Sequence, residues 1–167
     1  MKNFPFKAIN PDTGKEQIFW YSRSMAAAIF VFAPNKDGEL CILANKRGPG
    51  CPDFIGCWCC PCGYLDYGET LKQAIVREIH EETGVTIPIS ILRLVRIDDV
   101  PEGRQNVTIE FIADADVLTP ECVALSKEFC EKNEVDEVMW MPVANIDEYE
   151  WAFNHDKLIK DFQCYLK

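Results

Sequence analysis

Residues 63–85 read Gly63-Tyr-Leu-Asp-Tyr-Gly-Glu69-Thr-Leu-Lys-Gln-Ala-Ile-Val-Arg77-Glu78-Ile79-His-Glu81-Glu82-Thr-Gly84-Val85. Within this stretch the apolar residues Leu71, Ala74, Ile75 and Ile79 recur at helical spacing, and Gly84 is a typical stop signal. The pattern therefore predicts a helix over residues 70–83. Its opposite face is charged, so one side of the helix is expected to pack on a core while the other carries polar chemistry.

Three glutamates occupy the charged face. Glu78, Glu81 and Glu82 fall within about 100° of one another on a helical projection, which predicts that their carboxylates converge. Such crowding is costly without a cation, and hard oxygen ligands suit Mg²⁺, with Mn²⁺ as the alternative. Arg77 and Glu69 form an opposite-charge pair beside the cluster that is able to hold a glutamate in a fixed rotamer.

The same stretch resembles the Nudix box, Gly-x5-Glu-x7-Arg-Glu-U-x-Glu-Glu-x-Gly-U, in which U is aliphatic. It matches all seven fixed identities and both aliphatic positions. The resemblance implies a Nudix hydrolase of the α/β (α+β) class, with a mixed β-sheet in a Nudix-like α/β/α sandwich. The implied activity is that of a pyrophosphohydrolase that cleaves the diphosphate linkage of a nucleoside diphosphate derivative.

The resemblance also implies roles for individual residues. Glu78, Glu81 and Glu82 would hold Mg²⁺, with Arg77 and Glu69 supporting them. A weaker likeness extends upstream, where Gly56-Cys-Trp-Cys-Cys-Pro-Cys62-Gly63 stands in place of Gly-x-Trp-x-x-Pro-Gly-Gly. Cys62 replaces a glycine whose backbone carbonyl often helps to ligate metal in the family, so its carbonyl is a further candidate metal ligand.

Other residues are candidates for the remaining chemistry. A general base must remove the proton of the attacking water, and in some family members an acidic residue on a later loop does so. Glu134 is the first candidate here, with Glu137 and Glu110 as alternatives. Lys46 and Arg47 end an expected strand and are candidate ligands for substrate phosphate.

The rest of the chain predicts strands around two helices. We expect a β-hairpin from residues 25–32 and 40–46, joined by the turn Pro34-Asn-Lys-Asp-Gly38, and strands over residues 87–97, 107–113 and 138–141. Apolar residues on one helical stripe predict a C-terminal helix over residues 151–166.

Length and composition limit the function classes. The 167 residues predict a single domain over residues 1–167, and the net charge of −10 argues against non-specific binding to nucleic acid or to an anionic membrane. We therefore expect a small-molecule nucleotide as partner, with a homodimer as one assembly to consider. The N-terminus lacks an apolar segment of signal-peptide length, and no apolar run would span a bilayer, so a cytoplasmic location is expected.

The nine cysteines raise an alternative. Cys57, Cys59, Cys60 and Cys62 suggest a thiolate zinc site. On one extended strand, however, Cys57 and Cys59 would point away from Cys60 and Cys62, which works against a common ion. We expect these thiols to be buried small side chains, and the two histidines, His80 and His155, to be structural or solvated.

Two further readings of the family resemblance remain open. An enzyme resembling isopentenyl diphosphate isomerase would use a cysteine beside the box, and a nucleotide-sensing Nudix domain would lack turnover. The intact box favours hydrolysis over both. Pro101 lies sixteen residues after Val85, where ADP-ribose-type pyrophosphatases often have proline. The expected substrate is ADP-ribose or a related nucleotide, with Trp20, Tyr21 and Trp58 as candidate stacking partners for a base.

Overall fold

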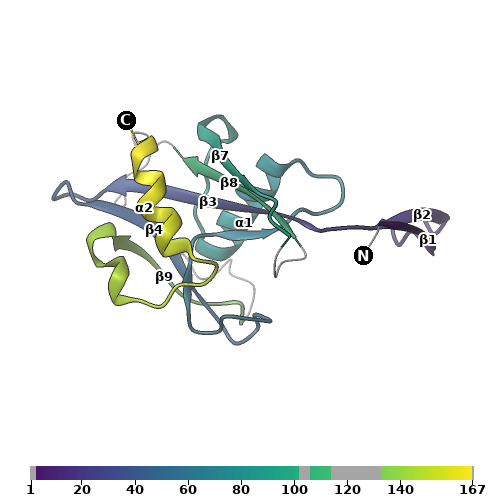
Figure 1. The fold of residues 1–167 in the computed structure, drawn as a ribbon, viewed down its shortest axis with the longest axis horizontal. Helices are drawn as coiled ribbons and strands as arrows, with labels where there is room; N and C mark the ends of the chain where they lie inside the picture. Colours follow the sequence, from purple (N-terminus) through teal and green to yellow (C-terminus); the bar gives the residue numbers. More distant parts are fainter. Residues whose placement is uncertain (1–2, 102–105, 114–132, 167) are drawn as a thin grey trace.

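The structure is a computed structural model that describes residues 3–101, 106–113 and 133–166. The strands and α-helices follow in the order β1 (Phe4–Ile9), β2 (Glu16–Tyr21), β3 (Met25–Pro34), β4 (Leu40–Arg47), β5 (Trp58–Cys59), β6 (Cys62–Tyr64), α1 (Leu71–Thr83), β7 (Leu92–Asp98), β8 (Val107–Ala113), β9 (Val135–Pro142) and α2 (His155–Phe162). Short 3₁₀ helices cover Ile89–Ile91, Val143–Glu148 and Gln163–Tyr165. Figure 1 shows their arrangement.

A mixed sheet forms the centre of the molecule. Its strand order is β5-β4-β3-β8-β7, with β6 also paired to β3 and β9 to β4. Strand β3 runs parallel to β8 and antiparallel to β4 and β6. The β3–β4 pairing places Phe32 opposite Ile42 and Pro34 opposite Leu40, which confirms the expected hairpin.

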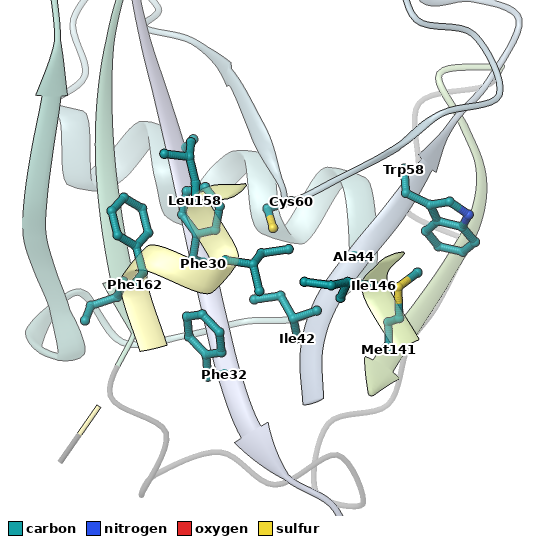
Figure 2. Close-up of a cluster of buried hydrophobic side chains, with 13 residues drawn as sticks. Phe30, Phe32, Ile42, Ala44, Trp58, Cys60, Met141, Ile146, Leu158 and Phe162 are labelled. Carbon is teal, nitrogen blue, oxygen red and sulfur yellow. The ribbon is translucent and has the colours of Figure 1, made fainter. Parts of the chain in front are cut away.

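The two helices contribute to cores on opposite faces of the sheet. On one face, Ile75 and Ile79 of α1 pack with Ile29 of β3 in a buried cluster. On the other, Leu158 and Phe162 of α2 pack with residues of β3 and β4, as Figure 2 shows. Alternation along β3 supplies both cores, because successive side chains of a strand point to opposite faces. This α/β/α layering is the architecture that the resemblance of residues 63–85 implies.

Helix α1 has the bounds that its sequence predicts. Thr70 caps the N-terminus, because its hydroxyl accepts a hydrogen bond from the Gln73 amide while the Gln73 side chain accepts one from the Thr70 amide. Gly84 ends the helix in the left-handed conformation, with φ of 75°, and donates its N–H to the His80 carbonyl. These caps confirm the expected helix over residues 70–83.

Several element boundaries differ from the expectation, including the strand expected over residues 138–141, which runs from Val135 to Pro142. The C-terminal helix begins at His155 rather than at residue 151, because Phe153 and Asn154 have φ of 58° and 57°, which no right-handed helix accommodates. The strand expected over residues 87–97 begins only at Leu92, after a 3₁₀ turn that follows Pro88. No helix within residues 3–101, 106–113 and 133–166 is both long and apolar enough to cross a membrane.

The β1–β2 hairpin lies apart from the central sheet, at the far right of Figure 1. Its two strands are held together by ladder pairing and by stacked rings, with Phe4 and Tyr21 5.1 Å apart and Phe6 and Phe19 5.9 Å apart. Phe19 also makes an edge contact with Tyr67, in the loop before α1. The hairpin is thereby connected to the loop of residues 65–70.

Candidate active site

A cavity of about 710 Å³ lies beside the C-terminal half of α1 and over the sheet. Strands β3 and β8 provide its floor, the loop of residues 51–54 closes one side, and the residues leading into α2 close another. Site residues expected from the sequence gather along its wall, namely Glu78, Glu81, Glu82, Arg77, Arg47, Cys62, Gly63 and Glu134. Residues far apart in the chain therefore share one cavity.

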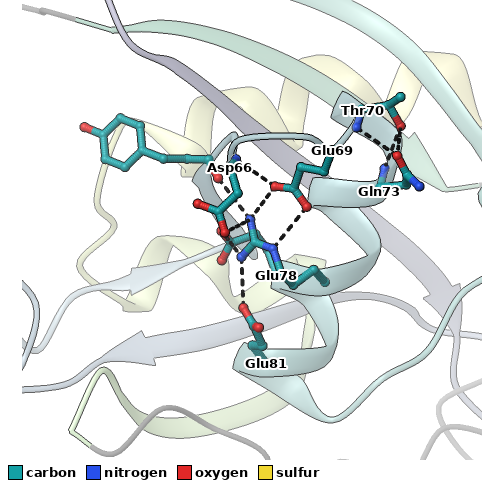
Figure 3. A network of polar contacts seen from close by, with 8 residues as sticks. Asp66, Glu69, Thr70, Gln73, Glu78 and Glu81 are labelled. Atoms are coloured by element: carbon teal, nitrogen blue, oxygen red, sulfur yellow. Dashed lines mark hydrogen bonds and ion pairs between the residues drawn. The ribbon is translucent and has the colours of Figure 1, made fainter. Parts of the chain in front are cut away.

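Arg77 forms ion pairs with Asp66, Glu69, Glu78 and Glu81, which are labelled in Figure 3. Its guanidinium donates to both Glu69 oxygens, at 2.7 and 3.2 Å, and to the Tyr64 carbonyl at 3.1 Å. It also donates to Glu78 at 2.8 Å and to Glu81 at 3.0 Å. The planar fork of an arginine suits such simultaneous contacts, whereas lysine presents a single point charge. Arg77 thus offsets the mutual repulsion of three carboxylates.

Glu82 is held separately, by the backbone of β6. Its carboxylate accepts a hydrogen bond from the Cys62 amide at 3.1 Å. The next residue, Gly63, lies against Glu78, and a Cβ at Gly63 would overlap the Glu78 carboxylate. The fixed glycine of the motif is therefore explained by space: only a residue without a side chain lets β6 approach the glutamates of α1 this closely.

The electrostatics of the glutamates reflect these positions. Burial raises the pKa of Glu78, and burial followed by the nearby Cys62 and Glu78 raises the pKa of Glu82 well above the ordinary value. The hydrogen bond from Arg77 lowers the pKa of Glu69. The wall of the cavity thus carries two carboxylates whose ionisation is disfavoured until a positive charge is added.

The donor set fits a hard divalent cation. Residues Glu78, Glu81 and Glu82 line the same cavity, and the Glu78 carboxylate occupies the space that a Cβ at Gly63 would take. Their arrangement differs from the simple convergence that the helical projection predicts, because Glu78 and Glu81 turn to Arg77 while Glu82 turns to Cys62. In the described ranges, no three His, Cys, Asp or Glu side chains are already grouped as metal ligands.

Lys46 and Arg47 do not lie together. Arg47 is buried at the cavity wall, where it donates to the Asp53 carboxylate at 2.7 Å and to the Asp53 carbonyl at 3.0 Å. Its guanidinium carbon also lies 4.9 Å from the centre of the Phe153 ring. Lys46 instead reaches Asp136 of β9, at 4.0 Å, outside the cavity lining. Adjacent residues of a strand point to opposite faces, so only one of the two reaches the site.

The candidate bases differ in their positions. Glu134 is exposed and lines the cavity, and its carbonyl anchors the Gly48 amide at 2.7 Å. Glu110 also lines the cavity, from the sheet floor, and is buried. Glu137 lies on β9 and is exposed, outside the lining residues. The structure thus brings two of the three acidic residues to the cavity.

Trp151, Phe153, Asn154 and His155 also line the cavity, although the sequence pattern predicts only a helix there. Phe153 stacks edge-on with Phe54, with ring centres 5.0 Å apart, and both residues have positive φ. His155 is buried, and its Nδ1 accepts a hydrogen bond from the Cys60 amide at 3.0 Å. Backbone strain of this kind is characteristic of ligand sites. No periodicity in the sequence signals it.

The aromatic residues expected to stack on a base lie elsewhere. Trp58 is buried in the core and makes an edge contact with Tyr149. Trp20 and Tyr21 are exposed on β2, outside the cavity lining. Pro101 is exposed and also outside the lining. Phe54 and Phe153 are instead aromatic residues that the cavity itself presents.

The cysteines follow a different geometry from simple alternation. Strand β5 ends at Cys59 and β6 begins at Cys62, so the extended run is interrupted at Cys60 and Pro61. The Cys59 thiol donates to Asn45 Oδ1 at 3.6 Å, and the nearby Cys59 thiol, followed by burial, raises the pKa of Cys62 well above its ordinary value. None of the seven cysteines within the described ranges is in a disulfide. Two thiols that alternation separates therefore lie side by side.

Comparison with known proteins gives relatives for this arrangement. The NUDIX domain family model matches residues 22–162. The ADP-ribose pyrophosphatase of Methanocaldococcus jannaschii is 30% identical over 128 residues, covering 76% of this chain and 67% of the relative. Nucleoside triphosphatase NudI of Salmonella typhimurium is 26% identical over 117 residues, covering 66% of this chain and 77% of the relative.

Solved structures share the fold. The NUDIX domain of Shewanella oneidensis NrtR, complexed with ADP ribose, superposes with a TM-score of 0.70 at 21% identity, covering 95% of this chain and 94% of that one. A bifunctional NMN adenylyltransferase/ADP ribose pyrophosphatase from Francisella tularensis, complexed with AMP and a manganese ion, gives a TM-score of 0.68 at 19% identity. The match covers 86% of this chain and 42% of that one.

Proposed function

The chain belongs to the Nudix hydrolase family, and from this premise we propose that it is a Mg²⁺-dependent enzyme that hydrolyses the diphosphate linkage of nucleoside diphosphate derivatives, with ADP-ribose as the favoured substrate. The observation that carries the proposal is the shared cavity. Glu78, Glu81 and Glu82, from one helix, meet the β6 backbone there, and the cavity volume is that of a nucleotide-sized ligand site.

The proposed metal ligands are the three glutamates and the Cys62 carbonyl. When bound, Mg²⁺ or Mn²⁺ would neutralise diphosphate oxygens and lower the pKa of an attacking water. Arg77 and Glu69 hold Glu78 and Glu81 in position, through the contacts of 2.7 to 3.2 Å described above. Lys46 has no part in the proposal, because its side chain lies outside the cavity lining.

Two further residues that line the cavity, Glu134 and Arg47, have proposed roles. Glu134 accepts the proton of the attacking water, because it is an exposed carboxylate that lines the cavity. Arg47 binds a substrate phosphate, since its buried guanidinium lines the cavity and is held in place by Asp53. Glu134 would thus activate the attacking water, and Arg47 would bind the phosphate that the water attacks.

ADP-ribose is favoured by the relatives. The M. jannaschii relative, at 30% identity, is named an ADP-ribose pyrophosphatase, and the NrtR domain with the same fold was solved with ADP ribose. Nucleoside triphosphates are the second candidate, because the relative NudI is named a nucleoside triphosphatase and the match covers 77% of the length of NudI.

A substrate screen tests the proposal. ADP-ribose, nucleotide sugars, dinucleoside polyphosphates, NADH and nucleoside triphosphates are each incubated with Mg²⁺ or with excess chelator. We expect AMP and ribose 5-phosphate from ADP-ribose, at a higher kcat/KM than any triphosphate, and no turnover in chelator. Heavy-oxygen water should label a phosphate-bearing product, since the proposed nucleophile is solvent. Faster release of pyrophosphate from a triphosphate would instead favour the second candidate.

A further inference from the structure

Glu110 lies on the floor of the cavity, at a distance from the glutamates of α1. The sheet register places Cys62 of β6 beside Ala28 of β3, and Ala28 beside Glu110 of β8. These three side chains share one face of the sheet, and Cys62 and Glu110 are two strand spacings, roughly 10 Å, apart. Glu110 therefore lines the same cavity as the proposed metal ligands. Its separation from Cys62 is that of a substrate group next to the diphosphate.

The floor around Glu110 is lined by small side chains. Ala26 and Ala28 of β3 line the cavity beside β8, opposite Thr108 and Glu110 in the sheet register. The Glu110 side chain is 3% exposed, and Arg96 Nε lies 3.6 Å from its carboxylate. Arg96 offsets the cost of burying this carboxylate, and Glu110 still lines the cavity, so its charge is available to a ligand on the cavity floor.

Thr108 adds a second polar group on the same face. It lies two residues before Glu110 on β8, lines the cavity, and its hydroxyl oxygen accepts a hydrogen bond from Asn106 at 3.2 Å. Because that oxygen already accepts, its own proton can be donated to another group. The floor thus offers an acceptor that never donates, Glu110, next to a hydroxyl donor, Thr108.

We propose that Glu110, together with Thr108, binds the ribose hydroxyls of the substrate and so determines its specificity. This inference rests on the proposed function. A hydroxyl both donates and accepts, and so matches a carboxylate beside a hydroxyl donor. A phosphate only accepts and would be repelled by the carboxylate, whereas an amino group only donates. Glu110 therefore favours a substrate that places a ribose hydroxyl, rather than a phosphate or an amino group, on this part of the cavity floor.

Three substrates test the proposal and distinguish the two riboses of ADP-ribose. The first is ADP-ribose, the second is its analogue built on 2′-deoxyadenosine, and the third is ADP joined to tetrahydrofurfuryl alcohol, whose ring carries no hydroxyl. We expect the wild type to prefer ADP-ribose over one analogue by about 10- to 100-fold in kcat/KM, the range of a hydrogen bond to a charged group. In Glu110→Gln that preference should fall to a few-fold.

The identity of the affected analogue decides which ribose is bound. Thr108→Val, which keeps the shape of the side chain, should reduce the same preference, and Glu148→Gln, an exposed acidic control outside the cavity lining, should leave it unchanged. Calorimetric titration of the three compounds in metal-free buffer should give the same order of affinities without turnover. Thermal unfolding shows which variants are folded.

Equal losses on all three substrates in both Glu110→Gln and Thr108→Val would overturn the inference, because a merely structural role lowers every activity alike. A wild type that treats the three compounds equally would also overturn it. Failure of the proposed function has a different signature, namely triphosphates hydrolysed faster than all three compounds. Wild-type cleavage of ADP-ribose with an unchanged preference in the variants would refute the role of Glu110 and Thr108 alone.

Discussion

Replacement of Glu82 by glutamine should raise stability and lower activity at the same time. Glu82 is partly buried, accepts a hydrogen bond from the Cys62 amide at 3.1 Å, and lies one helical turn after Glu78. Glutamine keeps the size of the side chain and an oxygen that can accept from Cys62, but removes the charge. The variant therefore isolates the charge from the packing.

The magnitude for stability follows from the repulsion on α1. Like charges four residues apart on a helix destabilise it by about 0.2–0.5 kcal/mol. For a chain of this size 1 kcal/mol corresponds to about 2–4 °C in Tm, so relief of the Glu78–Glu82 pair alone should raise Tm by about 0.5–2 °C in chelator. Relief of the desolvation of Glu82 adds to that value, which makes it a lower bound.

The pH dependence has a definite sign. Because the fold raises the pKa of Glu82, the folded chain keeps this proton at pH values where the unfolded chain has released it. Metal-free wild type should therefore lose stability as pH rises above about 4.3, the ordinary pKa of a glutamate, and through the folded pKa. Glu82→Gln lacks that loss, so its Tm advantage should grow from pH 4.5 to pH 7.5.

Activity should move the opposite way. Loss of one carboxylate from the proposed metal site should lower kcat by about 10²- to 10⁴-fold at saturating Mg²⁺, the scale on which electrostatic stabilisation of the transition state is felt. Differential scanning fluorimetry in chelator and initial rates with ADP-ribose give the two measurements, with Glu148→Gln as the control. Near-native turnover, or a Tm below that of the wild type at pH 7.5 in chelator, would refute the reasoning.

Three other substitutions test the site. Gly63→Ala should leave the chain folded but lower kcat at least tenfold, because the added Cβ displaces the flexible Glu78 carboxylate; an unchanged rate, measured beside circular dichroism, would contradict this. Arg77→Lys should lower stability by about 1–2 kcal/mol in denaturant unfolding and reduce kcat, because one ammonium cannot replace the guanidinium contacts; a neutral effect on both would count against the clamp. Cys59→Ser and Cys62→Ser, made singly, should each keep turnover within about tenfold apart from a folding loss of about 1–3 kcal/mol; abolished turnover in a folded variant, or zinc retained through gel filtration, would show that the thiols are functional.

Local patterns in the sequence were enough for the helix and its chemistry. The apolar spacing of α1, with Thr70 at its start and Gly84 at its end, predicts residues 70–83 because each feature depends on neighbours within one or two turns. The β3–β4 hairpin is predictable for the same reason, since the turn that joins its strands is short. The three glutamates lie on one wall of the cavity because the helix itself fixes their relative directions.

The split between Lys46 and Arg47 was also within reach of the sequence. Alternation along a strand sends neighbouring side chains to opposite faces, so a strand-end pair of cations cannot serve one phosphate. The same rule fails for Cys59 and Cys62, because the run is interrupted at Cys60 and Pro61 and the chain changes direction there. A rule of alternation holds only while the strand continues.

The sequence by itself determined the family, the class of fold and the acidic helix, because these depend on short-range spacing. Only the tertiary structure decided which residues distant in the chain share the cavity with the glutamates of α1. Strand order and register bring Glu110 into line with Cys62 across Ala28, and positive φ at Phe153 and Asn154 turns the residues before α2 toward the cavity. Such pairings depend on packing between segments up to a hundred residues apart, and no local pattern encodes them.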